Sequence, residues 1–349
     1  MLRAEPRGVP FAVVNLDEGA VTIAGKSNIG QTFTDGLVSG EGSLGGVEGE
    51  GADQNLSSAI SWSELQSEED LRLALEDNEV YGGVVIPENF TSQQMAALVG
   101  TGEAPEIVVY LNVAKNPQMA NSMQTVIAQA MLKAGVACDV EMVNDADLGG
   151  GQMAPMMSVQ MLVMPLFVML LLSSILTTVV FWVKDVTGLR GQGCPLKLLA
   201  CIVAASAVFS CAAALGALSI DCVAGGLSLP FGGLFVFLWL AAFCVMLCFV
   251  GLCLVRLPLG IVCALTVFAL GMGTAMMGPE MLPPFWADFV WPWVPQAHIG
   301  EGVRSLIYLG RMPAFADMAV LVSFGAVGAL ALIAVGMRES RKKEKGEIR

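Results

Sequence analysis

The sequence is poor in the residues that build metal sites and disulfide frameworks. It holds one histidine, His298, and none of its nine cysteines forms a C-x-x-C pair. Structural zinc sites need four Cys or His ligands at short spacings, so no metal, disulfide framework or cofactor is expected. Cys138 is the only cysteine before residue 157, which excludes an internal disulfide in the first half. Six others lie in apolar stretches and are interpreted as packing residues: Cys201, Cys211, Cys244, Cys248, Cys253 and Cys263.

Basic residues are scarce in the first half of the chain. Residues 1–156 carry 6 Lys or Arg against 22 Asp or Glu, whereas residues 157–349 carry 12 against 9. A region of such negative charge repels phosphate groups, so nucleic acid is excluded as a partner. The imbalance predicts a soluble acidic domain over residues 1–152.

Ionisable residues are also nearly missing from the long apolar runs of the second half. The chain is 55% hydrophobic with a mean hydropathy of +0.68, and a membrane helix needs about 20 apolar residues. Proton-driven carriers need carboxylates or histidines at depth, so the energy for any transport must come from elsewhere. Five stretches within residues 153–337 are predicted to span the membrane as helices: 157–183, 196–220, 229–255, 257–277 and 316–337.

Between the last two stretches lies a segment rich in Trp and Pro. Residues 279–312 contain Trp286, Trp291 and Trp293 among several prolines. Trp prefers the headgroup level of a bilayer, and broken helix is tolerated only where protein or water covers it. A re-entrant or interfacial segment is therefore expected.

Lys and Arg in short loops predict the orientation, because they stay on the cytoplasmic side. The basic tail 338–349 should be cytoplasmic, and threading five helices back places Lys184, Lys197 and Arg256 on the same side. The acidic domain is then expected to be extracytoplasmic. Three independent loops agree on this orientation.

Nothing in "MLRAEPRGVP" could export that domain, because it has no apolar signal region. We expect the natural protein to have a further N-terminal membrane helix. The alternative is that the first predicted membrane helix alone drives translocation of what precedes it.

The acidic domain alternates strand and helix patterns, which predicts an α/β fold with a mainly parallel sheet. The Gly-rich acidic stretch 38–55 predicts a flexible loop, and the last helix is expected to lead through a hinge at 149–151 into the membrane. Strands are expected at 11–15, 59–62, 81–86 and 107–111, and helices at 29–38, 68–75, 92–99 and 118–134.

One short stretch imitates a phosphate-binding loop. "AVTIAGKS", residues 20–27, has Lys26 and Ser27 in place but Ala20 where the first glycine belongs. A phosphate loop also needs a turn from strand into helix and an Asp at a strand end. We favour a simple turn over nucleotide binding.

Three segments together resemble one family. "VPFAVVNLDEGA", "VYGGVVIPENFT" and "IVVYLNVAKNP", in this order and spacing, are similar to the phage-infection-protein (YhgE/Pip) family, which is related to the ABC-2-type permeases. The resemblance implies a six-helix permease with an extracytoplasmic domain between its first two helices, working with a separate cytoplasmic ATPase. Family members usually have a membrane helix just before "AVVNLD", which this chain lacks.

The motif residues themselves favour a structural role over a ligand site. Asn15 and Asp17 can bond their own backbone and end the strand, and Gly19 supplies an unusual turn dihedral. Pro87 and Phe90 likewise read as a turn and a core anchor.

The loop "VKDVTGLRGQGCPLK" joins the first two predicted membrane helices. In ABC-2-type permeases the corresponding loop docks on the ATPase, and the resemblance assigns that role to five residues. The alternative is a solvated loop whose charges only fix topology. The five residues are Lys184, Asp185, Thr187, Leu189 and Arg190.

His298, Glu301 and Arg304 are spaced three apart and share one face of a helix. The H-x-x-E pair could ligate a metal or serve as acid and base, but no second ligand motif exists. We favour a Glu301–Arg304 pair on a membrane-surface helix at the outer face, where Arg304 could also contact lipid phosphate or an anionic cargo.

These observations, together with the resemblance, predict a non-enzymatic permease subunit of an ABC-2-like exporter in a bacterial plasma membrane. It is expected to move an amphipathic or lipid-linked cargo as a homo- or heterodimer, in contact with membrane lipid and a cytoplasmic ABC ATPase. The alternative is a cell-envelope receptor or secretion-complex scaffold without transport activity.

Overall fold

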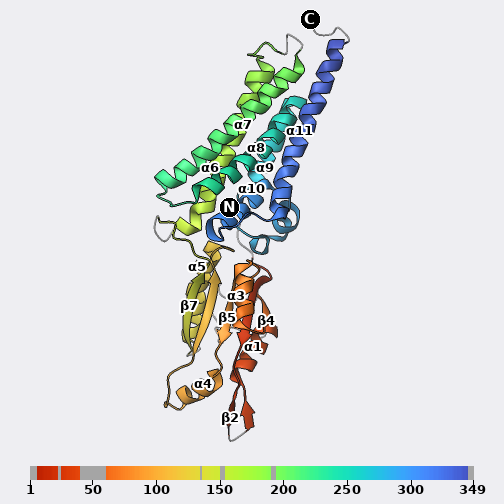
Figure 1. The fold of residues 1–349 in the computed structure, drawn as a ribbon. Coiled ribbons are helices and arrows are strands. Elements are labelled where there is room, and N and C mark those ends of the chain that lie inside the picture. The colour runs from red at the N-terminus through yellow and green to blue at the C-terminus, as the bar shows by residue number, and fades with distance from the viewer. Residues whose placement is uncertain are drawn as a thin grey trace. The chain divides into compact units, whose positions relative to one another are not determined.

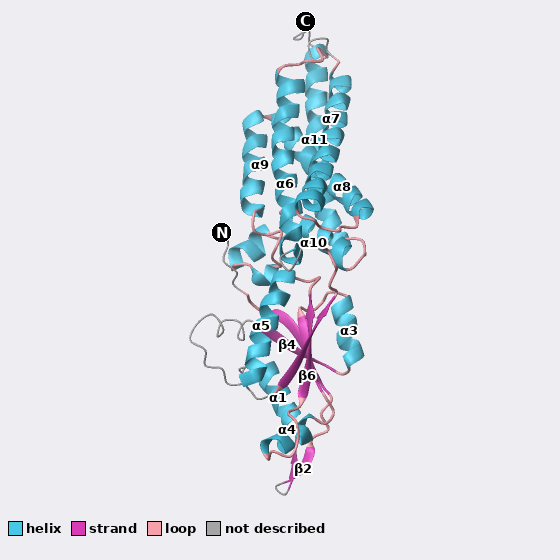
Figure 2. Ribbon diagram, turned by 90° about the vertical axis from the view of Figure 1, so that its left-hand side faces the viewer, coloured by secondary structure: helices cyan, strands magenta, loops and turns pink. Residues whose placement is uncertain are grey.

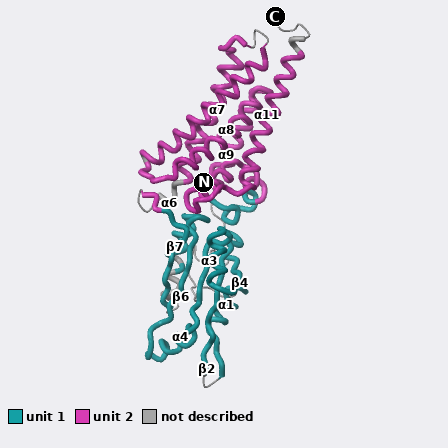
Figure 3. Tube along the Cα trace, in the orientation of Figure 1, with its two compact units in different colours: residues 1–146, 277–287 teal, residues 147–276, 288–349 magenta. Residues whose placement is uncertain are grey.

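The computed structural model describes residues 6–22, 25–39, 60–133, 136–149, 154–189 and 194–344 (Figure 1). The chain divides into two compact units (Figure 3). Unit 1 comprises Met1–Ala146 and Met277–Ala287, and unit 2 comprises Asp147–Met276 and Asp288–Arg349. Unit 1 contains the sheet and unit 2 is helical, which confirms the predicted mixture of an α/β region and a helical region (Figure 2).

Unit 1 is built on a five-stranded sheet with the order β4-β1-β5-β6-β7. Three of its four strand pairings are parallel, and only β5 and β6 run antiparallel. The prediction of a mainly parallel sheet is therefore confirmed. The strands are β1 (Val9–Asn15), β4 (Ile60–Leu65), β5 (Gly82–Ile86), β6 (Glu106–Asn112) and β7 (Ala137–Val143).

Helices α1 (Ile29–Ser39), α3 (Glu68–Glu76) and α5 (Pro117–Lys133) pack against this sheet, whereas α4 (Phe90–Leu98) packs against α1. In α3, Leu71 and Leu75 pack against Ala12 and Val14 of β1. Ser67 starts the helix, since its hydroxyl accepts a hydrogen bond from the backbone N–H of Asp70 at 3.1 Å.

Two expectations for unit 1 need correction. The last helix does not lead directly to the membrane, because strand β7 follows α5 and pairs with β6. Its sequence, "ACDVEMV", alternates exposed Asp139 and Glu141 with half-buried residues, so it lacks the apolar run of β1, β5 and β6. The first two residues of the expected loop 38–55 belong to α1, which continues to Ser39, and residues 40–55 lie outside the described residues.

The stretch that imitates a phosphate loop is a hairpin. Strands β2 (Ala20–Thr22) and β3 (Gly25–Ser27) pair antiparallel, with Val21 opposite Lys26. Lys26 and Ser27 therefore sit in a strand, whereas a phosphate loop needs them at the start of a helix. This geometry supports the turn interpretation over nucleotide binding.

Four helices of unit 2 are long and apolar enough to span a membrane. These candidate spans are Val159–Val183, Pro195–Val223, Phe231–Val255 and Phe315–Arg341. They correspond to α6 (Ala154–Thr177) with η2 (Thr178–Val183), α7 (Pro195–Ser219) with η3 (Ile220–Ala224), α8 (Phe231–Val255) and α11 (Phe315–Glu344). Four of the five predicted membrane helices thus have the expected length and composition.

The fifth predicted helix is shorter than expected. Helix α9 (Leu257–Gly271) has 15 residues and so extends about 22 Å, against about 30 Å of bilayer hydrocarbon. It gives way to turns at Gly271, and Gly273 lies within those turns. The residues predicted as re-entrant or interfacial form η4 (Pro279–Met281), η5 (Trp286–Val290) and α10 (Pro295–Tyr308).

Helix α8 is the centre of unit 2. Its apolar window is 67% buried, against 33% or less for the other three candidate spans, and it packs against α6, α7, α9, α10 and α11. Its closest neighbour is α11. A Cβ atom added to Gly328 of α11 would lie 2.3 Å from the backbone carbon of Leu247, and one added to Gly251 would lie 2.7 Å from the carbonyl oxygen of Gly328. Small residues allow this backbone approach, as is common between membrane helices.

Gly328→Ala is expected to destabilise unit 2, because the new methyl group cannot fit without moving α11 away from α8. Overpacking of this kind costs about 1–3 kcal/mol, and the thermal unfolding midpoint of the detergent-solubilised chain should fall. Gly232→Ala is the matched control, since a Cβ there has nothing within 4 Å. Equal midpoints for the two variants would contradict the close packing of α8 and α11.

Candidate functional site

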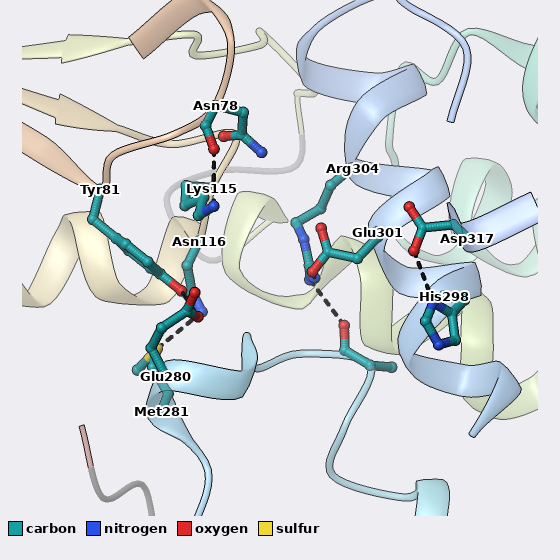
Figure 4. A network of polar contacts seen from close by, with 11 residues as sticks. Asn78, Tyr81, Lys115, Asn116, Glu280, Met281, His298, Glu301, Arg304 and Asp317 are labelled. Atoms are coloured by element: carbon teal, nitrogen blue, oxygen red, sulfur yellow. Dashed lines mark hydrogen bonds and ion pairs between the residues drawn. The ribbon is translucent and has the colours of Figure 1, made fainter. Parts of the chain in front are cut away.

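Arg304 of α10 is buried inside unit 2, with 2% of its surface exposed. Its Nη2 lies 2.5 Å from Oε1 of Glu301, and its Nη1 donates a hydrogen bond of 2.9 Å to the carbonyl oxygen of Ala275 (Figure 4). Helix α10 lies close to Ala275, because a Cβ atom added to Gly300 would lie 2.5 Å from the same carbonyl oxygen. The guanidinium therefore joins α10 to the turns that follow α9.

His298 forms a second pair on the same helix. Its Nδ1 lies 2.7 Å from Oδ1 of Asp317, at the start of α11, and its Nε2 lies 3.2 Å from the carbonyl oxygen of Pro292 (Figure 4). The Asp317 carboxylate and the Pro292 carbonyl are both acceptors, so each can accept a hydrogen bond from the ring nitrogen that faces it. The ring of Trp291 packs beside the imidazole, with centroids 5.2 Å apart.

The three residues that sequence spacing placed on one helix face thus form two separate pairs. Glu301 and Arg304 are joined as expected from the spacing, but His298 is joined to Asp317, which sequence reasoning missed. One feature of the sequence could have indicated this pair: Asp317 lies in the first turn of a predicted membrane helix, where a charged side chain needs a partner. Arg304 is enclosed by protein and is not presented to lipid phosphate or cargo. No group of three His, Cys, Asp or Glu that could hold a metal occurs in the part of the chain that the structure describes.

The loop after η2 is a compact turn. The backbone N–H of Lys184 donates to Val179 at 2.8 Å, and that of Gly188 donates to the carbonyl oxygen of Asp185 at 2.7 Å. Asp185 has φ +45° and Gly188 φ +65°, both in the left-handed region.

The hydroxyl of Thr187 lies 3.5 Å from the Asp185 carboxylate and also 3.5 Å from the backbone nitrogen of Leu189. The carbonyl of Leu189 accepts from Cys194 at 2.9 Å. These bonds leave Lys184 exposed, together with Val186. Arg190, the last of the five residues assigned to this loop, lies outside the described residues.

In unit 1, the motif residues around Asp17 form a buried polar centre. The Asp17 carboxylate accepts hydrogen bonds from the backbone N–H groups of Gly19, Gly30 and Thr91 at 3.1–3.3 Å and from the Thr91 hydroxyl. Burial by itself raises the pKa of Asp17, but the hydrogen bonds from Thr91, Gly30 and Gly19 outweigh it and lower this pKa below its usual value. The carboxylate thereby joins the end of β1 to the starts of α1 and α4.

The other motif residues support the same junction. The side-chain oxygen of Asn15 accepts from the backbone N–H of Asp17 at 3.1 Å, and Gly19 has φ +76°. Pro87 accepts from the backbone N–H of Phe90 at 3.1 Å, and Phe90 is buried at the start of α4. Each of these residues thus has a hydrogen-bonding, turn or packing role within unit 1.

The segment Met277–Ala287, which connects the apolar helix α9 to α10, packs with unit 1. The hydroxyl of Tyr81 donates to Glu280 at 3.1 Å, and the side-chain amide of Asn116 lies 3.2 Å from the sulfur of Met281 (Figure 4). Lys115 lies over the Tyr81 ring at 5.6 Å. The sequence analysis placed this segment in the membrane domain. No sequence pattern predicts a contact between residues nearly 200 positions apart, such as Tyr81 and Glu280.

Asp221 is a buried carboxylate that lies just beyond the end of the predicted membrane helix 196–220. It lies in η3, within the candidate span Pro195–Val223. Its side chain is fully buried, and neither carboxylate oxygen has a hydrogen-bond partner among the described residues. This candidate span thus contains a buried carboxylate close to its C-terminal end, besides Lys197 near its start.

Asp17→Asn is expected to destabilise unit 1, because the new amide NH2 would face backbone donors and leave at least one of them unpaired. An unpaired buried donor costs about 1–3 kcal/mol. Amide hydrogen exchange of the full chain should rise in β1, α1 and α4. Asp35→Asn, an equal charge change at an exposed position of α1, should leave exchange unchanged. Similar exchange in both variants would contradict this role of Asp17.

The same carboxylate gives a stability term that depends on pH. The pKa of Asp17 is lower in the folded chain than the value of about 3.9 for an unfolded Asp. Its stabilisation is therefore complete above about pH 3.9 and is lost as the pH falls through the folded-state pKa. The exchange difference between wild type and Asp17→Asn should shrink below that pH and stay constant above it.

Comparison with known proteins identifies one family. A family model described as "ABC-2 family transporter protein" matches residues 2–335. No curated protein matches the chain, and no solved structure matches it. The match covers nearly the whole chain, both the α/β unit and the apolar helices. The finer resemblance to the YhgE/Pip family stays a prediction. The chain is therefore a membrane protein that belongs to the ABC-2 transporter family.

Proposed function

We propose that the protein is the permease subunit of an exporter driven by a separate cytoplasmic ATPase. The observation that carries the proposal is the family match over residues 2–335. It is supported by the scarcity of ionisable residues in the candidate spans. A permease without its own energy source needs a partner that hydrolyses ATP. An amphipathic or lipid-linked cargo suits a passage lined by apolar helices.

The proposed orientation follows the distribution of basic residues. The turn after η2 carries Lys184, the loop before α9 carries Arg256, and the C-terminal tail is basic; all three belong on the cytoplasmic side by the positive-inside rule. Unit 1 then lies outside the cell. Helix α9, about 22 Å long, completes its crossing with the turns that follow it.

Docking of the ATPase is assigned to the turn that follows η2. The backbone hydrogen bonds within this turn hold its shape, and they leave Lys184 and Val186 exposed. A preformed surface binds with less entropic cost than a flexible loop. A cation beside an apolar side chain also suits a partner that supplies carboxylates around an apolar pocket.

A second candidate function is a receptor or scaffold in the cell envelope. One observation favours it: unit 1 exposes Val21 of the β2–β3 hairpin, and also Leu98 and Val99 at the end of α4, by 72–88%. Hairpin and helix lie at the same end of unit 1 (Figures 1 and 2). Clustered apolar residues on a surface mark sites of protein contact. This candidate predicts an extracytoplasmic partner and no ATPase.

Lys184→Glu is expected to weaken capture of an ATPase subunit when the tagged full chain is purified in mild detergent. Reversing a charge at a docking surface places like charges together, so binding should fall at least about ten-fold. Mass spectrometry of the captured proteins gives the measurement. Arg256→Glu is the matched control, because it reverses an exposed charge on the same proposed side outside the loop.

Two outcomes would contradict these assignments. If wild type captures envelope or secretion proteins but no ATPase, the permease proposal fails and the scaffold takes its place. Equal losses in the two variants would leave the permease proposal standing but remove the docking role of the turn at Lys184.

A further inference from the structure

An apolar groove of about 990 Å³ lies between helices α7 and α11 of unit 2. The two helices lie beside each other in the bundle (Figure 2). From α7 the groove is lined by Leu196, Leu199, Ala200, Val203, Ala204 and Ala207, and from α11 by Ala329, Leu332, Ile333, Gly336, Met337, Ser340 and Arg341. Along α7 this stretch extends about 17 Å.

Small side chains open the groove. Ala200, Ala204 and Ala207 on α7 face Ala329 and Gly336 on α11, so neither helix fills the space between them. Leu332 is buried and forms part of the floor. An apolar groove of this length accommodates a flexible hydrocarbon chain.

Polar groups occur at one end only. Ser340 and Arg341 line the end near the C-terminus of α11, whereas Ala207 and Ala329 line the other end. Exposed Arg338 and Lys197 add positive charge to the same helix ends. No acidic residue occurs among the described residues that line the groove.

We propose that this groove binds one anionic glycerophospholipid, with an acyl chain along the groove and the phosphate at Arg341 and Ser340. An arginine binds phosphate through a planar fork of N–H donors, and a basic cluster at a membrane helix end attracts anionic lipid. The proposed site is a specific lipid site. It does not depend on the proposed transport function.

A tryptophan behind the groove supplies a reporter. The indole N–H of Trp239, on α8, donates a hydrogen bond of 3.0 Å to the carbonyl oxygen of Ala207. Ala207 lines the apolar end of the groove. Bromine on a bound acyl chain should therefore quench Trp239, and subtraction of the signal of a Trp239→Phe variant isolates this tryptophan from the others.

The test uses the full chain in phosphatidylcholine nanodiscs that contain a small share of acyl-brominated lipid. The brominated lipid carries either a phosphatidylglycerol or a phosphatidylcholine headgroup. Trp239 quenching should favour phosphatidylglycerol by about five-fold, the value of one basic contact near the membrane surface. Arg341→Lys should keep part of this preference and Arg341→Glu should abolish it. Ala204→Phe, which fills the groove at an exposed position, should reduce quenching by both lipids.

Arg338→Glu is the matched control, because it makes the same charge change one turn away on α11 and outside the groove lining. The proposal predicts that it keeps most of the headgroup preference. An equal loss in Arg338→Glu and Arg341→Glu would overturn the proposal in favour of diffuse attraction. Quenching without headgroup preference in wild type, or cross-linking of two copies through α7 and α11 with no quenching, would also overturn it.

Discussion

The close packing of α11 against α8 is the contact on which the rest of unit 2 depends. Gly251 and Gly328 let the two helix backbones approach, and α8 contacts every other long helix of the unit. The position of α11 then fixes Asp317 at its start, where the carboxylate meets His298 of α10. It also fixes which side chains of α11 face α7. The contact between α8 and α11 therefore determines both the buried polar pair and the apolar groove.

A charged group buried inside a protein needs partners. Arg304 satisfies a carbonyl in the turns after α9 and pairs with Glu301, so α10 is joined to the end of a helix that is too short to span by itself. Asp221 departs from this rule among the described residues. The segment Met277–Ala287 leaves the helical unit and packs with unit 1 through Tyr81 and Asn116. The polypeptide chain thus passes between the two units more than once.

The sequence predicted the elements whose signal is local and missed those that depend on distant partners. Strands β1, β5 and β6 contain continuous apolar runs, as buried strands do, and four candidate membrane helices have the length that hydrocarbon requires. Strand β7 was missed because an edge strand with Asp139 and Glu141 has no such run. The pairing of Glu301 with Arg304 follows from helix geometry, whereas that of His298 with Asp317 depends on how α10 and α11 pack. No local pattern carries that information.

Chemical labelling of the two sides of the membrane tests the central claim, that a permease presents its coupling turn to the cytoplasm and unit 1 to the outside. Val21→Cys and Val186→Cys place thiols at positions that are 88% and 72% exposed, and the wild-type chain gives the background from native cysteines. A membrane-impermeant maleimide should label Val21→Cys in intact cells and Val186→Cys only after permeabilisation. The reverse pattern would contradict the account, because an ATPase in the cytoplasm could not then reach the turn at Lys184.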